Sequence, residues 1–248
     1  MEKYFNIKYE FDKSVVHDNI NIAVKKNSTQ YICVADANIL QQVATDIDYR
    51  DVVNGSMFSI CDSSWVPLFL KQIYGIEREH YCGSMIFKDI IEKKQYRQFF
   101  MGTSEEILIA LQRNLTEIDP SIENMTFYEL PYCNVGDFDY QEIATMVNKD
   151  NPDIIWVALG APKQEIFMSK LKPYLNRGVM IAVGAAFKFF SGLEEKRAPV
   201  WMQKMHLEFA YRLLSDPKKQ FLRCYQILVS LPGVLREEIS RKKNNSGL

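Results

Sequence analysis

The sequence of 248 residues lacks several patterns on which common protein classes depend. Its five cysteines lie far apart and form no C-x-x-C pair, so we expect reduced thiols rather than a zinc site or a disulfide framework. There is no G-x-G-x-x-G fingerprint and no Walker A loop, which argues against dehydrogenases and P-loop enzymes. The three histidines show no ligand spacing, and no D-x-D pair follows a predicted strand. The sequence therefore predicts no metal and no cofactor.

Long apolar runs are also missing. The first residues contain no apolar stretch of signal-peptide length, and the longest late stretch, residues 227–235, is broken by Ser230, Pro232 and Gly233. We therefore expect no integral membrane segment. The overall composition of 47% apolar, 12% aromatic and 25% charged residues is typical of a compact globular protein.

A net charge of −1 conceals two parts of opposite charge. Residues 196–248 contain 11 basic and 4 acidic residues, a net charge of +7, whereas residues 1–195 carry a net charge of −8. A basic tail on an acidic body predicts an anionic partner for the tail, such as a phosphorylated substrate, a lipid surface or a nucleic acid. Nucleic acid is the weakest of these, because the basic residues lack the interleaved aromatic residues of a base-stacking surface.

Short apolar runs alternate with helical patterns along most of the chain. Because these runs are continuous rather than alternating, they predict strands buried on both faces, as in a parallel sheet covered by helices. The sequence thus predicts an α/β protein with a doubly wound, mostly parallel, Rossmann-like sheet. The predicted strands are residues 31–35, 58–62, 98–102, 125–130, 153–160 and 179–184.

The pattern changes after Gly192, where strand signals stop. Two helices are predicted, at residues 199–214 and from Pro217 to about Ser230. The second is amphipathic and basic, so it suits either an anionic membrane surface or a phosphorylated ligand, or it simply packs on the sheet. We therefore divide the chain into an α/β core at residues 1–195 and a basic helical appendage at residues 196–248.

Ligands of open parallel sheets bind beyond the carboxyl ends of the strands, and two such ends here carry polar groups. Asp62 follows a buried strand and is either the N-cap of the next helix or a general base. Gly102 allows a tight turn, and Thr103 with Glu106 matches a capping box that could also border a phosphate or ribose.

Two further strand ends have unusual chemistry. One strand ends at Gly160, and Lys163 and Gln164 stand in the first turn of the following helix. A cation there opposes the helix dipole, at a cost of up to about 1 kcal/mol that an anionic ligand could remove. Small residues after the next strand, beginning at Gly184, allow close approach of a ligand or of a helix.

The second half of the chain resembles the WecB/TagA/CpsF glycosyltransferases, and the order of the motifs is the same over essentially the whole chain. The segments that carry the resemblance are NPDIIWVALGAPKQE at 151–165, GAAFKFFSG at 184–192, RAPVWMQ at 197–203, LEFAYRL at 207–213 and DP at 216–217. The resemblance implies an inverting, metal-independent transfer of an N-acetylmannosamine-like sugar or related hexose. The donor would be a UDP-sugar and the acceptor a polyprenyl-diphosphate-linked saccharide, at the cytoplasmic face of the cell membrane.

The resemblance also implies roles for particular residues. Asp62 takes the place of the proposed general base, and Asn38 and Gln164 match residues that orient the sugars. Basic residues of the appendage would meet the diphosphate and an anionic membrane surface. The residues that we expect to contact donor or acceptor are Asp36, His80, Gly102, Thr103, Asp137, Gly160, Lys163, Glu165, Gly184, Arg212, Lys219 and Arg223. We also expect a homo-oligomer, from the apolar helices near the tail.

Five positions depart from the family pattern. The departures are Asp36 in place of Thr, His80 in place of Arg, Met85 in place of Asp, Asp137 near a usual aromatic residue, and Lys188 in place of Asp. They leave two alternatives open, a nucleotide-sugar-binding protein of an assembly complex that has lost turnover, and a hydrolase that uses Asp62. The identity of the sugars and of the polymer is not encoded in any motif.

Overall fold

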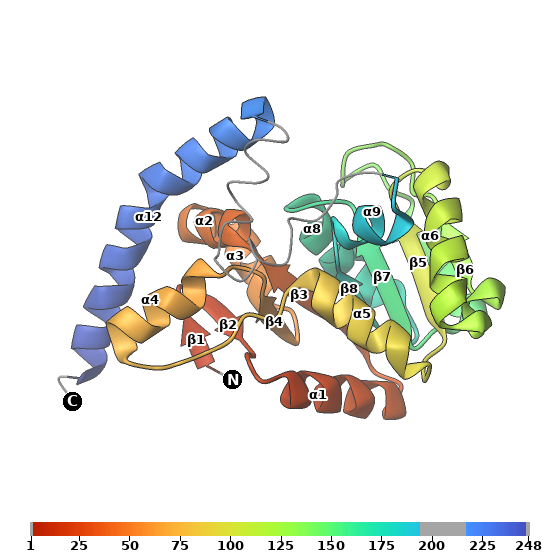
Figure 1. The fold of residues 1–248 in the computed structure, drawn as a ribbon, viewed down its shortest axis with the longest axis horizontal. Helices are drawn as coiled ribbons and strands as arrows, with labels where there is room; N and C mark the ends of the chain where they lie inside the picture. Colours follow the sequence, from red (N-terminus) through yellow and green to blue (C-terminus); the bar gives the residue numbers. More distant parts are fainter. Residues whose placement is uncertain (1, 194–216, 247–248) are drawn as a thin grey trace.

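The computed structural model describes residues 2–193 and 217–246, and its fold is a sheet between two layers of helices (Figure 1). The strand order is β1-β2-β4-β3-β8-β7-β5-β6, and every neighbouring pair except β1 with β2 is parallel. The predicted fold class is therefore confirmed.

All six predicted strands are present within two residues of their expected ends. They are β3 (Thr29–Ala35), β4 (Phe58–Cys61), β5 (Gln98–Gly102), β6 (Thr126–Tyr128), β7 (Ile154–Ala158) and β8 (Gly178–Ala182). Apart from β6, these strands are almost entirely buried, which explains their continuous apolar sequences. In the interior strand β7, the buried indole of Trp156 donates a hydrogen bond to the Gln98 side chain at 2.7 Å.

An N-terminal hairpin was not predicted. Strands β1 (Glu2–Tyr4) and β2 (Ile7–Tyr9) are antiparallel, and Phe5 and Asn6 connect them with φ angles of 51° and 62°. Two residues with positive φ form the turn that matches the twist of a hairpin. These strands are too short to produce a continuous apolar run, and only the alternation of apolar residues at Ile7 and Tyr9 indicates them.

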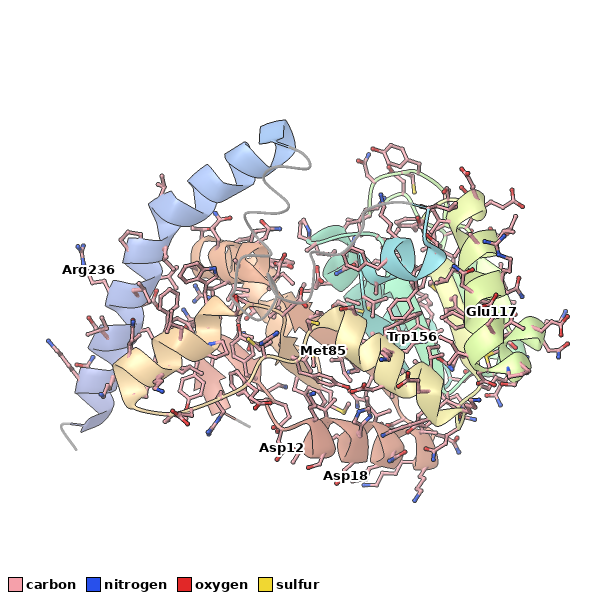
Figure 2. All side chains as sticks on the ribbon, viewed as in Figure 1. Asp12, Asp18, Met85, Glu117, Trp156 and Arg236 are labelled. Carbon is pink, nitrogen blue, oxygen red and sulfur yellow. The ribbon has the colours of Figure 1, made fainter. Side chains whose placement is uncertain are left out.

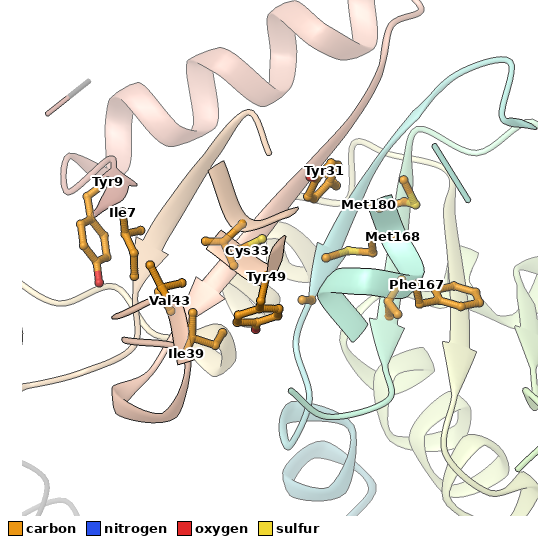
Figure 3. Close-up of a cluster of buried hydrophobic side chains, with 14 of the residues drawn as sticks. Ile7, Tyr9, Tyr31, Cys33, Ile39, Val43, Tyr49, Phe167, Met168 and Met180 are labelled. Atoms are coloured by element: carbon orange, nitrogen blue, oxygen red, sulfur yellow. The ribbon is translucent and has the colours of Figure 1, made fainter. Parts of the chain in front are cut away.

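Helices cover both faces of the sheet, because alternate residues of each central strand enter different clusters of apolar side chains. In β3, Tyr31 and Cys33 belong to one cluster, and Ile32 and Val34 to the other. The first cluster, part of which is drawn in Figure 3, is closed by α2 (Ala37–Thr45), α3 (Ile47–Asn54), α4 (Trp65–Tyr74), α7 (Tyr140–Asp150) and α8 (Lys163–Leu171). The second is closed by α1 (Lys13–Lys25), α5 (Gly83–Lys93), α6 (Glu105–Ile118) and α9 (Ala186–Ser191).

The last helix, α12 (Pro217–Ser246), runs along the β1 edge of the molecule (Figure 1). The predicted end near Ser230 is wrong, because the helix continues through Pro232. Proline inside a helix costs about 3 kcal/mol. Packing beyond it offsets this cost, since Val234 and Glu238 are 8% and 1% exposed, whereas Arg236 points outward in Figure 2. The predicted helix at 199–214 and the boundary at 195/196 lie outside the described residues.

Candidate active site

Two of the expected residues follow neighbouring parallel strands at the same level. Ala35 and Cys61 are paired in the register of β3 and β4, and the Asp62 amide donates to the Ala35 carbonyl at 3.0 Å. Asp36 is the N-cap of α2, and its Oδ1 accepts from the amides of Asn38 and Ile39 at 3.0 and 2.9 Å. This places Asp36, Asn38 and Asp62 together at the carboxyl edge of the sheet.

The Asp62 carboxylate is held by the start of another helix. Its Oδ1 accepts from the amide of Gly83, the first residue of α5, at 2.9 Å. Helix α4 begins at Trp65 with Ser64 as its N-cap, so Asp62 is not the N-cap of the next helix. A Cβ atom on Gly83 would lie 3.2 Å from Cγ1 of Val34 and 3.6 Å from the carbonyl oxygen of Val183. Gly83 therefore fits between the ends of β3 and β8 and presents its amide to Asp62.

Gln164 connects the ends of β7 and β8. Its Oε1 accepts from the Gly160 amide at 3.1 Å, and a Cβ atom on Gly184 would lie 3.5 Å from the same oxygen. Gln164 is only 4% exposed, so it supports the floor of the site and offers little surface to a ligand. Gly83, which binds Asp62, thus lies against Val183 at the end of β8, and Gln164 lies against the adjacent Gly184 and bonds to Gly160.

Gly102 and Thr103 form a tight turn beside β7. A Cβ atom on Gly102 would lie 2.4 Å from the carbonyl oxygen of Ala158, and its φ is +108°, so only glycine fits. Thr103 also has a left-handed φ of 57°. The predicted capping box is wrong, because an N-cap needs extended backbone, and this is found at Ser104. Ser104 makes no side-chain cap hydrogen bond.

Lys163 binds the loop at residues 131–139. Its Nζ donates to the Cys133 carbonyl and lies 5.0 and 5.7 Å from the ring centroids of Phe138 and Tyr132. Asp137, in the same loop, is exposed and accepts a hydrogen bond from the Asn134 amide group at 3.1 Å. The loop is thus attached to the first turn of α8, and its acceptors and aromatic rings partly compensate the Lys163 charge.

Glu165 lies beneath this edge and is completely buried. Its Oε1 accepts from Gln164 Nε2 at 2.9 Å, and its Oε2 accepts from the Tyr49 hydroxyl at 3.0 Å. Burial raises the pKa of Glu165 to about 7, although both hydrogen bonds favour the charged form. Tyr49, from α3, was not predicted. Its place in the apolar cluster is shown in Figure 3, and no motif in the sequence distinguishes it from an ordinary core residue.

The remaining candidate positions are described only by their location and burial. His80 is half-buried between α4 and α5, and Lys188 is half-buried in α9. Met85 packs against the second apolar cluster and is labelled in Figure 2. Arg212 lies outside the described residues. Lys219 and Arg223 belong to α12, in a part whose side chains the structure does not describe.

Metal-binding groups and membrane-spanning helices are both absent from what the structure describes of residues 2–193 and 217–246. No group of three or more His, Cys, Asp or Glu side chains that could hold a metal ion occurs among them. Within the same residues, no helix has the length and apolar character needed to cross a membrane. Cys33, Cys61, Cys82 and Cys133, whose side chains the structure describes, are free thiols.

Comparison with known proteins gives one consistent result. The chain is 29% identical over 204 residues to N-acetylglucosaminyldiphosphoundecaprenol N-acetyl-beta-D-mannosaminyltransferase of Bacillus subtilis, covering 79% of this chain and 75% of that protein. It is 28% identical over 221 residues to the protein of the same name from Bacillus spizizenii, covering 88% and 83%. For the protein of that name from Staphylococcus aureus, identity is 27% over 212 residues, covering 82% and 79%.

The family model of the WecG/TagA/CpsF glycosyl transferases matches residues 5–244, nearly the whole chain. This range includes the ends of β3, β4, β5, β7 and β8 and most of α12. The protein is a member of the glycosyl transferase WecG/TagA/CpsF family.

Proposed function

We propose that this protein transfers N-acetylmannosamine, or a closely related hexose, from a UDP-sugar to a polyprenyl-diphosphate-linked saccharide for cell-surface polysaccharide synthesis. The names of the three relatives support both the transferred sugar and an acceptor of N-acetylglucosamine on diphosphoundecaprenol. The observation that carries the proposal is the position of Asp62, a half-buried carboxylate anchored by Gly83 at the carboxyl edge of the sheet.

Asp62 is the general base in this proposal. The acceptor hydroxyl gives its proton to the Asp62 carboxylate while the hydroxyl oxygen bonds to the anomeric carbon of the donor. The bond between that carbon and the UDP oxygen breaks with its electron pair, so UDP leaves from the opposite face and the configuration is inverted. A hydrogen bond from the Gly83 amide fixes the orientation of the carboxylate before the acceptor arrives.

The leaving diphosphate needs positive potential, because its charge grows as the bond breaks. Helices α6 and α8 begin near Gly102 and Gly160, and neither has a side-chain cap hydrogen bond at its N-terminus. Helices α4, α5 and α9 also lack such a bond, whereas in α1, α2, α3 and α7 an aspartate caps the first amides. The N-termini of α6 and α8 thus suit an anionic ligand, and we assign the remaining compensation to Arg212, Lys219 and Arg223.

We place the reaction on the inner face of the cell membrane, with the protein bound peripherally through its C-terminal helices and assembled as a homo-oligomer. The described end of α12 supports the membrane contact, because apolar Val229 and Ile239 are 63% and 42% exposed, and Arg236 and Lys243 are also exposed. Each cation near an anionic lipid surface contributes about 1 kcal/mol.

The test is a screen of UDP-sugars with N-acetylglucosaminyl-diphosphoundecaprenol, read both as UDP release and as lipid-linked product. We expect turnover with UDP-N-acetylmannosamine that depends on the acceptor. The Asp62→Asn variant should lose at least a hundredfold in turnover, the lower range for removal of a general base. Asp18→Asn is the matched control, because Asp18 is exposed on the outer side of α1 (Figure 2).

Three results would contradict the proposal. Binding of UDP without acceptor-dependent release would indicate a protein that has lost turnover. Consumption of a UDP-sugar with water alone would indicate a hydrolase. Near-normal transfer by a folded Asp62→Asn variant would remove Asp62 from the role of base.

A further inference from the structure

The side-chain amide of Gln164 is held between one group that only donates and one that only accepts. The Gly160 amide donates to Oε1 at 3.1 Å, and Nε2 donates to Glu165 at 2.9 Å. A backbone N–H has no acceptor, and an ionised carboxylate has no proton to give. Only one of the two orientations of the Gln164 amide therefore satisfies both neighbours while Glu165 is charged.

A proton on Glu165 weakens this arrangement wherever it resides. On Oε1 it faces Nε2 of Gln164, so the amide must turn, and its NH2 group then opposes the Gly160 N–H. On Oε2 it reverses the hydrogen bond with Tyr49, and Gln164 then donates to a neutral carbonyl instead of a carboxylate. Charge-assisted hydrogen bonds are about twice as strong as neutral ones, so Gln164 is held less firmly in either case.

The groups that face Glu165 come from three other elements. Tyr49 of α3 donates to it at 3.0 Å. The Asp36 charge, at the start of α2, contributes to raising the pKa of Glu165, and burial is the larger cause. Cys33 of β3 is completely buried, and burial raises the pKa of its thiol well above the usual value, so the thiol stays neutral. Tyr49 is thus the neighbour whose hydroxyl bonds directly to the carboxylate and stabilises its charged form.

We propose that Tyr49 and Glu165 are positioning residues that hold Gln164 across the ends of β7 and β8, and that the ionised form of Glu165 does so. The effect of this pair on sugar transfer rests on the proposed function. Gln164 bonds to Gly160 and lies beside Gly184, and the loops that contain these two glycines border the candidate site. Gln164 is thereby held from the side that faces the core, which leaves the solvent side of the two loops to the donor.

The experiment follows the Gly160 amide by NMR between pH 5.5 and 9 in full-length protein, because that N–H bonds directly to Gln164. In the wild type we expect a titration with a midpoint near 7, the pKa raised by burial of Glu165. Tyr49→Phe should move the midpoint upward by about one unit, since it removes one hydrogen bond to the charged form. Glu165→Gln should abolish the titration, because the side chain no longer ionises.

The second readout is kcat and KM for transfer over the same pH range. We expect kcat to fall on the acid side of the midpoint, and we expect this limb to move with the NMR midpoint in Tyr49→Phe and to disappear in Glu165→Gln. Tyr96→Phe is the matched control, since the Tyr96 hydroxyl bonds to Asn21 on the other face of the sheet.

Equal Gly160 midpoints in Tyr49→Phe and Tyr96→Phe would overturn the inference. If the pH at which kcat falls stays the same in Tyr49→Phe while the Gly160 midpoint moves, the catalytic part of the inference is overturned. If the wild type transfers no sugar, the proposed function fails instead, and the amide titration alone then decides whether Tyr49 and Glu165 control Gln164.

Discussion

Glu238 is the residue whose removal should damage the fold most specifically. It lies in α12 and is 1% exposed, and its carboxylate accepts from the Phe5 amide at 2.9 Å, the Tyr74 hydroxyl at 2.8 Å and the Arg241 guanidinium at 2.9 Å. The first two bonds join the C-terminal helix to the N-terminal hairpin and to α4, and the third lies within α12. We predict that Glu238→Ala weakens all three contacts together.

The loss in the free energy of unfolding depends on how buried each partner of Glu238 is once its acceptor has been removed. The Phe5 amide is left buried without a partner, at a cost of about 1–3 kcal/mol. Arg241 is 28% exposed, so water compensates part of its loss, and Tyr74 is partly exposed as well. Removal of one member of a buried ion pair costs about 3–5 kcal/mol, and we expect about 4 kcal/mol in the free energy of unfolding. For a chain of this length that lowers Tm by roughly 10 °C.

The assay is urea unfolding followed by circular dichroism, with Glu237→Ala as the matched control. Glu237 is the adjacent glutamate and is half-exposed, and it also accepts from Arg241, at 3.2 Å, and from the Asn6 side chain, at 2.9 Å. The two glutamates therefore share Arg241 as a partner and differ in their burial and in their other partners. Exposed pairs contribute about 0–1 kcal/mol, which is the loss expected for the control. Equal loss of stability in the two variants would refute the reasoning, because it would mean that the buried contacts of Glu238 do not anchor α12.

Three further predictions concern the candidate site. Gly102→Ala should lower the free energy of unfolding by roughly 3 kcal/mol in thermal unfolding, because the added Cβ meets the Ala158 carbonyl of β7 at a residue with positive φ. In the control Gly136→Ala the added Cβ meets nothing within 4 Å, so the free energy of unfolding should change little. The Gly83→Pro variant should have a kcat for sugar transfer about tenfold lower than that of Gly83→Ala, because only proline removes the amide N–H that binds Asp62. Proline is tolerated at the first position of a helix, so the fold should be retained. Equal kcat values in the two variants would contradict this prediction. Glu165 has a pKa raised from 4.5 to about 7, so the folded protein binds more protons than the unfolded chain in that window, and the unfolding free energy falls as pH rises. Relative to Glu165→Gln, the wild type should lose about 3 kcal/mol between pH 4.5 and 7 in urea titrations, and a constant difference would contradict the raised pKa.

The sequence by itself determined the layers of the fold and the ends of the six predicted strands. Continuous apolar runs are a local property, since a strand buried on both faces needs them wherever it lies in the sheet. All six predicted strands are therefore found, and the residues that follow two of these runs place Asn38 and Asp62 just beyond strand ends. The hairpin at β1 and β2 was missed because three-residue strands leave too short a pattern.

The tertiary structure alone decided which groups support these ends, because their contacts join residues far apart in the chain. Tyr49 and Glu165 are separated by 116 positions, and Phe5 and Glu238 by 233. No local periodicity records such a pair, and a buried glutamate looks in sequence like an exposed one. The same reason explains the length of α12, since a helix that continues past Pro232 depends on packing against the core and not on its own propensity.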